Sequence, residues 1–318
     1  MSDQRYPQQA NDFAMQPYAD DEIDLKELFA VLWAGKLQII GVTFVAAVLA
    51  VVIALMMPNI YRSEALLSPV SAGSGGAAGL ASKFGGLASL AGISLPGGGA
   101  DKTGLGIEVL KSRQFLQEFV AKRNILPELM AVEAWDASTN QLSFNEDVYV
   151  SSTNTWVREA KPPRKAKPSV QEAHEAFLEI LSVTQDKESG FVSIGIEHHS
   201  PVVAQQWVSW LVEDINETIR KQDVEQAERS INYLKEQINS TSLTELQAGF
   251  FEMIQSQTET IMLAKASPEY LFKTIDPAVV PELKSKPKRA LIAVLGTLLG
   301  GMLGVLIVLI RHYAFSKE

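Results

Sequence analysis

The sequence LQIIGVTFVAAVLAVVIALMM occupies residues 37–57, and the sequence ALIAVLGTLLGGMLGVLIVLI occupies residues 290–310. Neither stretch contains a charged side chain. Each run of 21 residues would span about 31 Å as an α-helix, at ~1.5 Å per residue. This length matches the ~30 Å hydrocarbon core of a bilayer. Both runs are therefore predicted to be transmembrane helices.

The two predicted spans divide the chain into short tails and a long middle region. A polar, acidic stretch precedes the first run and no small-residue cleavage site follows it, which argues against a signal peptide. Two spans place both tails on one side of the membrane. Basic residues near the spans favour a cytoplasmic middle by number, but that rule governs short loops and decides little for a long domain. The predicted domains are an N-terminal tail at 1–36, spans at 37–57 and 290–310, a base domain at 58–200, an extended helical region at 201–265, a return to the membrane at 266–289 and a C-terminal tail at 311–318.

The composition removes several classes of function. The chain carries 28 basic and 37 acidic side chains, and its net charge of −9 offers no electrostatic footprint for nucleic acid. It contains no cysteine, which excludes disulfides, thiolate zinc sites, iron–sulfur clusters and a cysteine nucleophile. No Ser/His/Asp or paired-carboxylate spacing stands out. We therefore predict no catalytic site, no cofactor and no metal.

The base domain is predicted to be mixed α/β. Composition and alternating apolar residues predict a strand at 60–67 and a hairpin at 183–197. Apolar residues at helical spacing predict a helix at 107–123, with Asn124 as its stop. Ser169 is predicted to cap a further helix.

The largest predicted feature of the middle region is a long helix. Residues 201–239 would reach about 58 Å and keep a narrow apolar stripe. Residues 242–245 match a capping box that would start a second helix reaching Lys265, so we expect a helical hairpin or a sharp kink. The candidate residues for packing between helices or protomers are Trp207, Trp210 and Ile215. The fold class is thus an α/β membrane protein, with two transmembrane helices flanking a mixed α/β base and a long protruding helical hairpin.

Three segments of the middle region suggest binding sites, and for each a simpler interpretation is preferred. The glycine-rich segment 71–106 matches no phosphate-binding pattern and is predicted to be a flexible loop. His198 and His199 would point to opposite faces of a strand, which disfavours a shared metal ion. The basic, proline-rich run 161–168 is interpreted as a solvated loop in preference to a glycan or phosphate site.

Small residues recur at helical spacing in both spans. Gly296, Gly300 and Gly304 fall on one face of the second span. The first span repeats the pattern with Ala46, Ala50 and Ala54. Small residues let helices approach closely in lipid, so these faces are predicted to pack between spans or between protomers.

The segment before the second span carries a specific resemblance. It contains Ile275-Asp276-Pro277-Ala278, then Pro281, and then Pro287-Lys288-Arg289 directly before the glycine-bearing span. Together with two terminal spans, a strand after the first span and a long helical extension, this segment resembles the chain-length determinant family, the polysaccharide co-polymerases of the bacterial inner membrane. The glycine-rich insertion and the short helical extension depart from the family's pattern.

The resemblance implies a non-catalytic protein with cytoplasmic termini and a periplasmic middle domain. Such proteins assemble as a ring of identical subunits and set the length of O-antigen or related polysaccharides. The implied partners are a separate membrane polymerase, its lipid-linked glycan and membrane lipids. The membrane-proximal motif of Pro277, Pro281, Pro287, Lys288 and Arg289 would fix the approach to the membrane. Its cations, together with Lys284 and Lys286, would meet lipid phosphates, the preferred interpretation, or a polyprenyl pyrophosphate carrier.

Two other classes of function stay in view. An export adaptor for capsule or exopolysaccharide belongs to the same broader superfamily and would share these features. A two-span sensor would need a cytoplasmic output module, which the eight residues after Ile310 do not hold. The chain has no Walker lysine loop, so we expect no fused kinase, while a separate kinase partner stays open.

Overall fold

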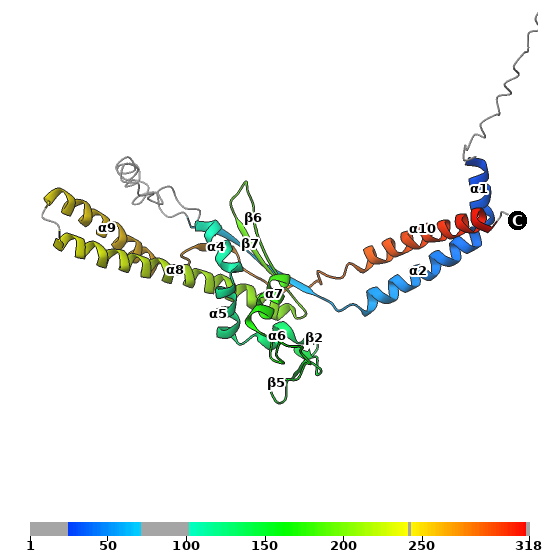
Figure 1. The fold of residues 1–318 in the computed structure, drawn as a ribbon, viewed down its shortest axis with the longest axis horizontal. Coiled ribbons are helices and arrows are strands. Elements are labelled where there is room, and N and C mark those ends of the chain that lie inside the picture. Colours follow the sequence, from blue (N-terminus) through cyan, green and yellow to red (C-terminus); the bar gives the residue numbers. More distant parts are fainter. Residues whose placement is uncertain (1–24, 71–101, 241–242, 316–318) are drawn as a thin grey trace, which may run out of the picture. The chain divides into compact units, whose positions relative to one another are not determined.

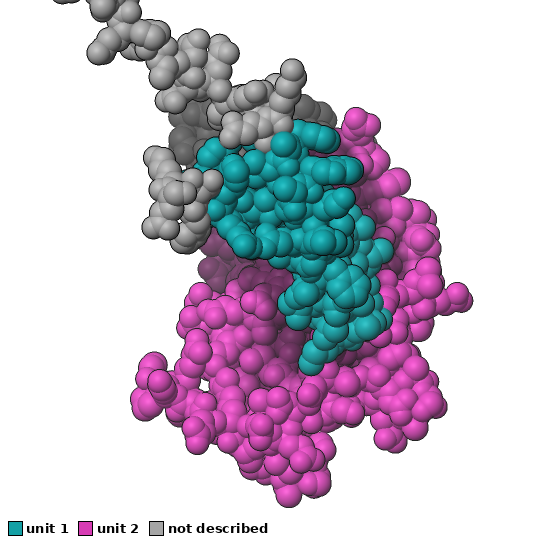
Figure 2. Space-filling view, turned by 90° about the vertical axis from the view of Figure 1, so that its right-hand side faces the viewer, with its two compact units in different colours: residues 1–56, 289–318 teal, residues 57–288 magenta. Residues whose placement is uncertain are grey.

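The computed structural model describes residues 25–70, 102–240 and 243–315 (Figure 1). The chain forms two compact units. Unit 1 comprises residues 1–56 and 289–318, and unit 2 comprises residues 57–288 (Figure 2). The first and last parts of the sequence thus belong to one unit.

The described residues of unit 1 form three helices, α1 (Leu25–Ala34), α2 (Lys36–Met56) and α10 (Arg289–Phe315). Helices α2 and α10 lie side by side, and both are long and apolar enough to cross a membrane (Figure 1). Their outward side chains are mostly large apolar groups left exposed, such as Leu55 at 61% and Leu299 at 59%. An exposed apolar surface of this extent suits lipid as its solvent. Helix α10 continues for five residues beyond the predicted end at Ile310.

Unit 2 is organised around a four-stranded antiparallel sheet. The strand order is β6 (Leu181–Gln185), β7 (Val192–His198), β1 (Tyr61–Pro69) and β8 (Phe272–Asp276). The predicted hairpin is present as β6 and β7, and the predicted strand at 60–67 is present as β1, which continues to Pro69. β8 pairs with β1 across roughly 200 residues of sequence, and this pairing was not predicted.

One face of the sheet forms the core. Along β7, Val192, Ile194 and Ile196 are fully buried, Ser193 and Glu197 are half-buried, and Gly195, which has no side chain, is also buried. Helix α8 (Pro201–Ser240) packs on β1 and β7 and supplies the other side of this core. Period-two burial on the strands and an apolar stripe on the helix are the patterns expected of a two-layer α/β arrangement.

Three further helices complete the core of unit 2. The predicted single helix at 107–123 is in fact two, α4 (Lys102–Lys111) and α5 (Arg113–Arg123), because Ser112 interrupts it as an N-cap that accepts from Phe115 N at 3.2 Å. Asn124 ends α5, as predicted, and adopts the left-handed conformation. Ser169 caps α7 (Val170–Ile180) through a capping box with Glu172, also as predicted.

The boundary of the glycine-rich segment is corrected. Residues 71–101 lie outside the described part of the chain, but 102–106 form the first half of α4. Gly106 is buried there, and a Cβ at this position would overlap the Leu271 side chain. The close approach of α4 to Leu271 therefore accounts for a glycine within a helix.

A small lobe between α5 and α7 was not predicted. It contains α6 (Leu126–Met130) and two short hairpins, β2 (Val132–Asp136) with β3 (Gln141–Phe144), and β4 (Tyr149–Val150) with β5 (Thr155–Trp156).

The long helical region consists of α8 and α9 (Thr244–Ala266), which pack along each other (Figure 1). Ala227, Leu234 and Ala264 are buried in this pair. Helix α9 has no side-chain hydrogen bond at its N-cap residue Leu243, and the predicted capping serine, Ser242, lies outside the described residues.

Candidate functional site

The two apolar helices of unit 1 meet along a seam of small residues. A Cβ at Gly296 would overlap Ala50, and a Cβ at Gly300 would overlap Ala46. A Cβ at Gly304 would lie 3.0 Å from the Ile39 Cα and 3.2 Å from its carbonyl oxygen. The glycines predicted on one face of the second span thus face the first span of the same chain.

This seam has the chemistry expected of helix association in lipid. Absent side chains let the two backbones approach closely, which increases dispersion contacts where no hydrophobic driving force acts between helices. Thr43 and Thr297 lie within the helices and donate their hydroxyls to backbone carbonyls four residues earlier, at 2.7 Å each. Arg289 Nε donates to the Ala54 carbonyl at 3.0 Å and so anchors the start of α10 to the end of α2.

The membrane-proximal motif is joined to the start of β1 by backbone hydrogen bonds. Ile60 N donates to the Lys286 carbonyl at 3.0 Å, and Ser285 N donates to the Ile60 carbonyl at 2.8 Å. Further along, Ser63 Oγ donates to the Val279 carbonyl at 2.7 Å. The segment that enters the second span is therefore held beside the segment that leaves the first.

The three prolines of the motif lie in different environments. Pro287 is buried, Pro281 is half-buried and Pro277 is exposed. Proline fixes φ near −65° and lacks an N–H donor, so it restricts the path of the segment without adding an unsatisfied donor. Ala278, next to Pro277, accepts a hydrogen bond from Gln205 Nε2 at 3.2 Å, which ties this end of the motif to α8.

Two lysines beside the membrane-proximal motif make contacts within unit 2. Lys286 Nζ lies 2.5 Å from Glu197 Oε2 of β7 and is thereby engaged within unit 2. Lys284 Nζ donates to Asn59 Oδ1 at 3.3 Å. Lys288 is exposed and keeps its charge at the surface.

The candidate packing residues Trp207 and Ile215 lie in the core of unit 2, where both are completely buried. The Trp207 ring stacks on Phe177 with centroids 5.8 Å apart and contacts His198 at 5.2 Å. The apolar stripe of α8 therefore faces the sheet of its own chain. Of the two kinds of packing predicted for these residues, the structure shows packing between elements of the same chain.

Trp210, the third candidate, is half-buried at the α5 side of α8. The Arg123 guanidinium lies over its ring, 4.9 Å from the centroid, in a cation–π contact. Asp214, one turn later, is buried and receives Lys122 Nζ at 2.8 Å and Arg123 Nη2 at 2.7 Å. Hydrogen bonding to Asp214 raises the pKa of both Lys122 and Arg123.

Asn216 is a buried anchoring residue that the sequence did not reveal. Its Oδ1 accepts from Leu271 N at 2.7 Å and from Phe272 N at 2.9 Å, and its Nδ2 donates to the Phe272 carbonyl at 3.1 Å. The side chain is buried. Asn216 thus clamps the start of β8, and so the path to the membrane-proximal motif, onto α8.

His198 has a structural environment. Its Nε2 lies 3.2 Å from the Glu128 carbonyl, and its Nδ1 accepts from Ser200 N at 3.0 Å, so the neutral ring satisfies both partners. Burial lowers the pKa of His198 to about 4. Among the described residues no group of three or more potential metal ligands is close enough to hold an ion.

Two family models match the chain. The model described as "Chain length determinant protein" matches residues 21–123, which contain the elements from α1 to α5. The model described as "G-rich domain on putative tyrosine kinase" matches residues 245–313, which contain β8 and most of α9 and α10. No curated protein matches the chain.

Solved structures with detectable similarity include a full-length bacterial polysaccharide co-polymerase. It shares 16% identity at a TM-score of 0.39, over 93% of this chain and 99% of that chain. Another is a fragment of WzzB, a polysaccharide co-polymerase from Salmonella Typhimurium, with 14% identity and a TM-score of 0.26 over 72% of this chain and all of that one. These values are too low to support an argument about fold or function.

The assignment therefore depends on the two sequence models. They match opposite ends of the chain, and those ends contain the two apolar helices and the paired strands β1 and β8. Residues 21–123 are therefore similar to the chain length determinant family and residues 245–313 to the G-rich domain, and the two apolar helices are long enough for a membrane anchor.

Proposed function

We propose that this protein regulates the chain length of a bacterial surface polysaccharide, O-antigen or a related glycan, as a non-catalytic scaffold that acts with a separate membrane polymerase. The observation that carries the proposal is the match of residues 21–123 to the chain length determinant model. The described contacts are consistent with a scaffold. The candidate residues on α8 and α10 pack helices and strands together, and the membrane-proximal motif is held to β1 by backbone hydrogen bonds.

The structure offers a mechanical path for such a role. Asn216 holds β8 on the long helix α8, and the chain passes from β8 through the membrane-proximal motif into α10. The motif is fixed to β1 by the Ile60 hydrogen bonds. A load on the α8–α9 pair would therefore reach the spans through hydrogen-bonded segments. We propose that a ring of identical subunits uses this path to bias when the polymerase stops extending the lipid-linked glycan.

The proposed location is the inner membrane, with cytoplasmic termini and residues 58–289 in the periplasm. A reporter active only in the periplasm, inserted within the run 161–168, of which 161–167 are exposed, should be active. A cytoplasm-only reporter at the same point should be silent. The opposite pair of results would refute the proposed topology.

Deletion of the gene, followed by gel analysis of surface polysaccharide, tests the function. We expect polymer to persist with a broader or shifted length distribution, and the intact gene to restore the original one. Loss of surface polymer with intracellular accumulation would support the export adaptor. Loss of all polymer, with subunits still made and flipped, would support an essential polymerising role.

A further inference from the structure

The run at 161–168, which we name the basic loop, differs in charge from the rest of the chain. It carries Lys161, Arg164, Lys165 and Lys167 without an acidic residue, in a protein whose net charge is −9. Lys165 and Lys167 are exposed, and neither makes an ion pair with any residue that the structure describes. A local positive field on an acidic protein attracts anions selectively to one place.

The basic loop is held in shape by contacts of its backbone. Arg158 Nε donates to the Ala166 carbonyl at 2.7 Å, and Arg158 Nη2 donates to the Lys165 carbonyl at 3.0 Å. The same guanidinium pairs with Glu172 of α7 at 2.9 Å. Pro168, at the end of the loop, is buried. The lysine side chains therefore project from an ordered frame.

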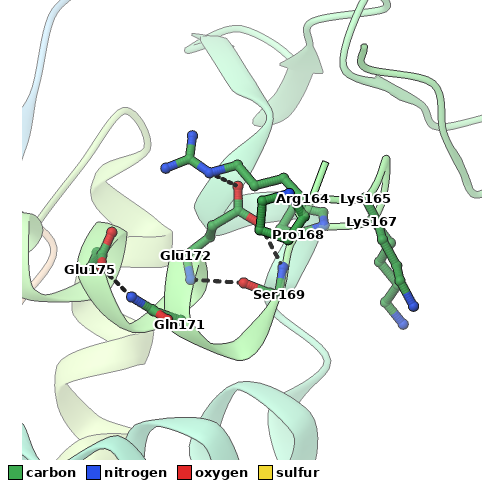
Figure 3. A pocket seen from close by; sticks show the side chains of 9 residues that line it. Arg164, Lys165, Lys167, Pro168, Ser169, Gln171, Glu172 and Glu175 are labelled. Atoms are coloured by element: carbon green, nitrogen blue, oxygen red, sulfur yellow. Dashed lines mark hydrogen bonds and ion pairs between the residues drawn. The ribbon is translucent and has the colours of Figure 1, made fainter. Parts of the chain in front are cut away.

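Neither Glu172 nor Glu175 forms an ion pair with Lys165 or Lys167. Glu172 accepts from Ser169 N at 3.0 Å and is paired with Arg158, and these contacts lower its pKa. Glu175 accepts from Gln171 Nε2 at 3.1 Å. Figure 3 shows both contacts along α7, with Arg164 reaching to Glu172.

The basic loop and the first turns of α7 line a pocket of about 580 Å³ that is open to solvent (Figure 3). This volume lies in the range of small-ligand sites. Its lining combines cations with the acceptors of Gln171 and Glu175 and the proline rings of Pro163 and Pro168. Among the nine lining residues there is no bulky aliphatic or aromatic side chain.

We propose that this pocket binds saccharides that carry carboxylate groups, and so holds an acidic segment of the glycan. Lys165 and Lys167 would pair with the carboxylates, while the amide and carboxylate groups of α7 would meet sugar hydroxyls. Proline rings offer flat C–H surfaces to the apolar face of a sugar. A membrane surface is a poorer match because the lining offers no large apolar side chain for insertion. The proposal rests on the proposed function, which it extends to the chemistry of the glycan.

The test is direct binding to the purified full-length protein in detergent. The probes are an oligogalacturonate, which is carboxylated, and maltohexaose, which is neutral. We expect the oligogalacturonate to bind and maltohexaose to bind much more weakly. The double substitution Lys165→Gln with Lys167→Gln should weaken oligogalacturonate binding about fivefold. The matched control Lys187→Gln with Lys235→Gln removes two exposed lysines elsewhere and should change it less than about twofold.

Several outcomes would overturn the proposal. They are no binding of the oligogalacturonate, equal loss in the control variant, and equal competition by inorganic phosphate. Binding of phosphatidylglycerol vesicles with the same dependence on Lys165 and Lys167 would assign the pocket to the membrane instead. Each result is separate from the proposed function, because the length distribution in the deletion strain is measured without reference to this pocket.

Discussion

Substitution of Gly304 by alanine should weaken the pairing of α2 with α10. The added Cβ would lie 3.0 Å from the Ile39 Cα and 3.2 Å from its carbonyl oxygen, whereas apolar atoms prefer about 3.5–4.0 Å. Both neighbouring atoms belong to the backbone of α2, so no side-chain rotation relieves the contact. The helices would have to separate by about 0.5–1 Å.

The expected cost follows from this separation. A gap of about 0.5–1 Å forfeits roughly a quarter to a half of the dispersion energy of the contacts it opens. Overpacking of this kind costs about 1–3 kcal/mol. The population of the closely paired helices should therefore fall about five- to 150-fold relative to the separated state.

Disulfide capture can report this pairing, because the natural sequence contains no cysteine. A Cβ at position 301 would lie 3.7 Å from Thr43 Oγ1, so cysteines introduced as Thr43→Cys and Gly301→Cys are placed to form a bond across the seam. In the assay, SDS is added to purified protein in increasing proportion to separate the two helices, and the protein is then oxidised. The measured quantity is the SDS fraction at which half of the chains form the disulfide between positions 43 and 301. We expect Gly304→Ala to lower that fraction.

Gly41→Ala is the matched control, because a Cβ at Gly41 meets nothing within 4 Å. It places the same substitution in the same helix pair and should leave the midpoint unchanged. Equal midpoints for Gly304→Ala and Gly41→Ala would refute the inference that the glycine seam holds the two helices together.

Three further predictions concern unit 2. Asn216→Ala should lower the free energy of unfolding by about 2 kcal/mol or more in denaturant titrations, because it leaves the buried backbone N–H groups of Leu271 and Phe272 without an acceptor. An unchanged midpoint would contradict the role of Asn216 in holding β8 on α8. Asp214→Asn should cost about 1–3 kcal/mol in the same titration, since it removes the shared partner of two cations, whereas Glu213→Gln, at an exposed carboxylate, should cost less than about 0.5 kcal/mol. The pKa of His198 is about 4 in the folded protein and ~6.5 in an unfolded chain. The contribution of neutral His198 to the free energy of unfolding is therefore fully present above pH ~6.5. It decreases by about 3 kcal/mol in total as the pH falls to about 4 and below. His198→Gln should flatten this pH dependence in thermal melts, and a slope equal to that of the parent protein would show that His198 is not its source.

Local signals account for what the sequence predicted well. The capping serine Ser169, the left-handed Asn124 and the hairpin at 183–197 each depend on residues within a few positions of one another. The two apolar helices were equally accessible, since length and uninterrupted apolarity suffice. Such features need no knowledge of distant partners.

Long-range pairing accounts for most of what was missed. The partnership of β1 with β8 joins segments about 200 residues apart, and no local pattern encodes it. The break at Ser112 was hidden because apolar spacing continues through it into α5. The short hairpins between α6 and α7 have too few residues to show a clear period.

In the candidate site, too, the sequence predicted local features but not their distant partners. Glycine spacing predicted a packing face on α10, but only the structure identified Ala46, Ala50 and Ile39 as its partners. The stripe containing Trp207 predicted burial without telling an intramolecular partner from another protomer. Asn216 escaped notice because a single polar residue beside an apolar stripe has no motif, although its hydrogen bonds reach a strand 55 residues away.

The proposed role of this protein is to set polymer length without catalysing polymerisation. The most direct test compares the deletion strain with the complemented strain and measures the surface glycan's total repeat units and its number of chain ends. We predict that deletion changes the ratio of repeat units to chain ends while the total number of repeat units stays nearly constant. An unchanged ratio, with the total falling toward zero, would contradict the account.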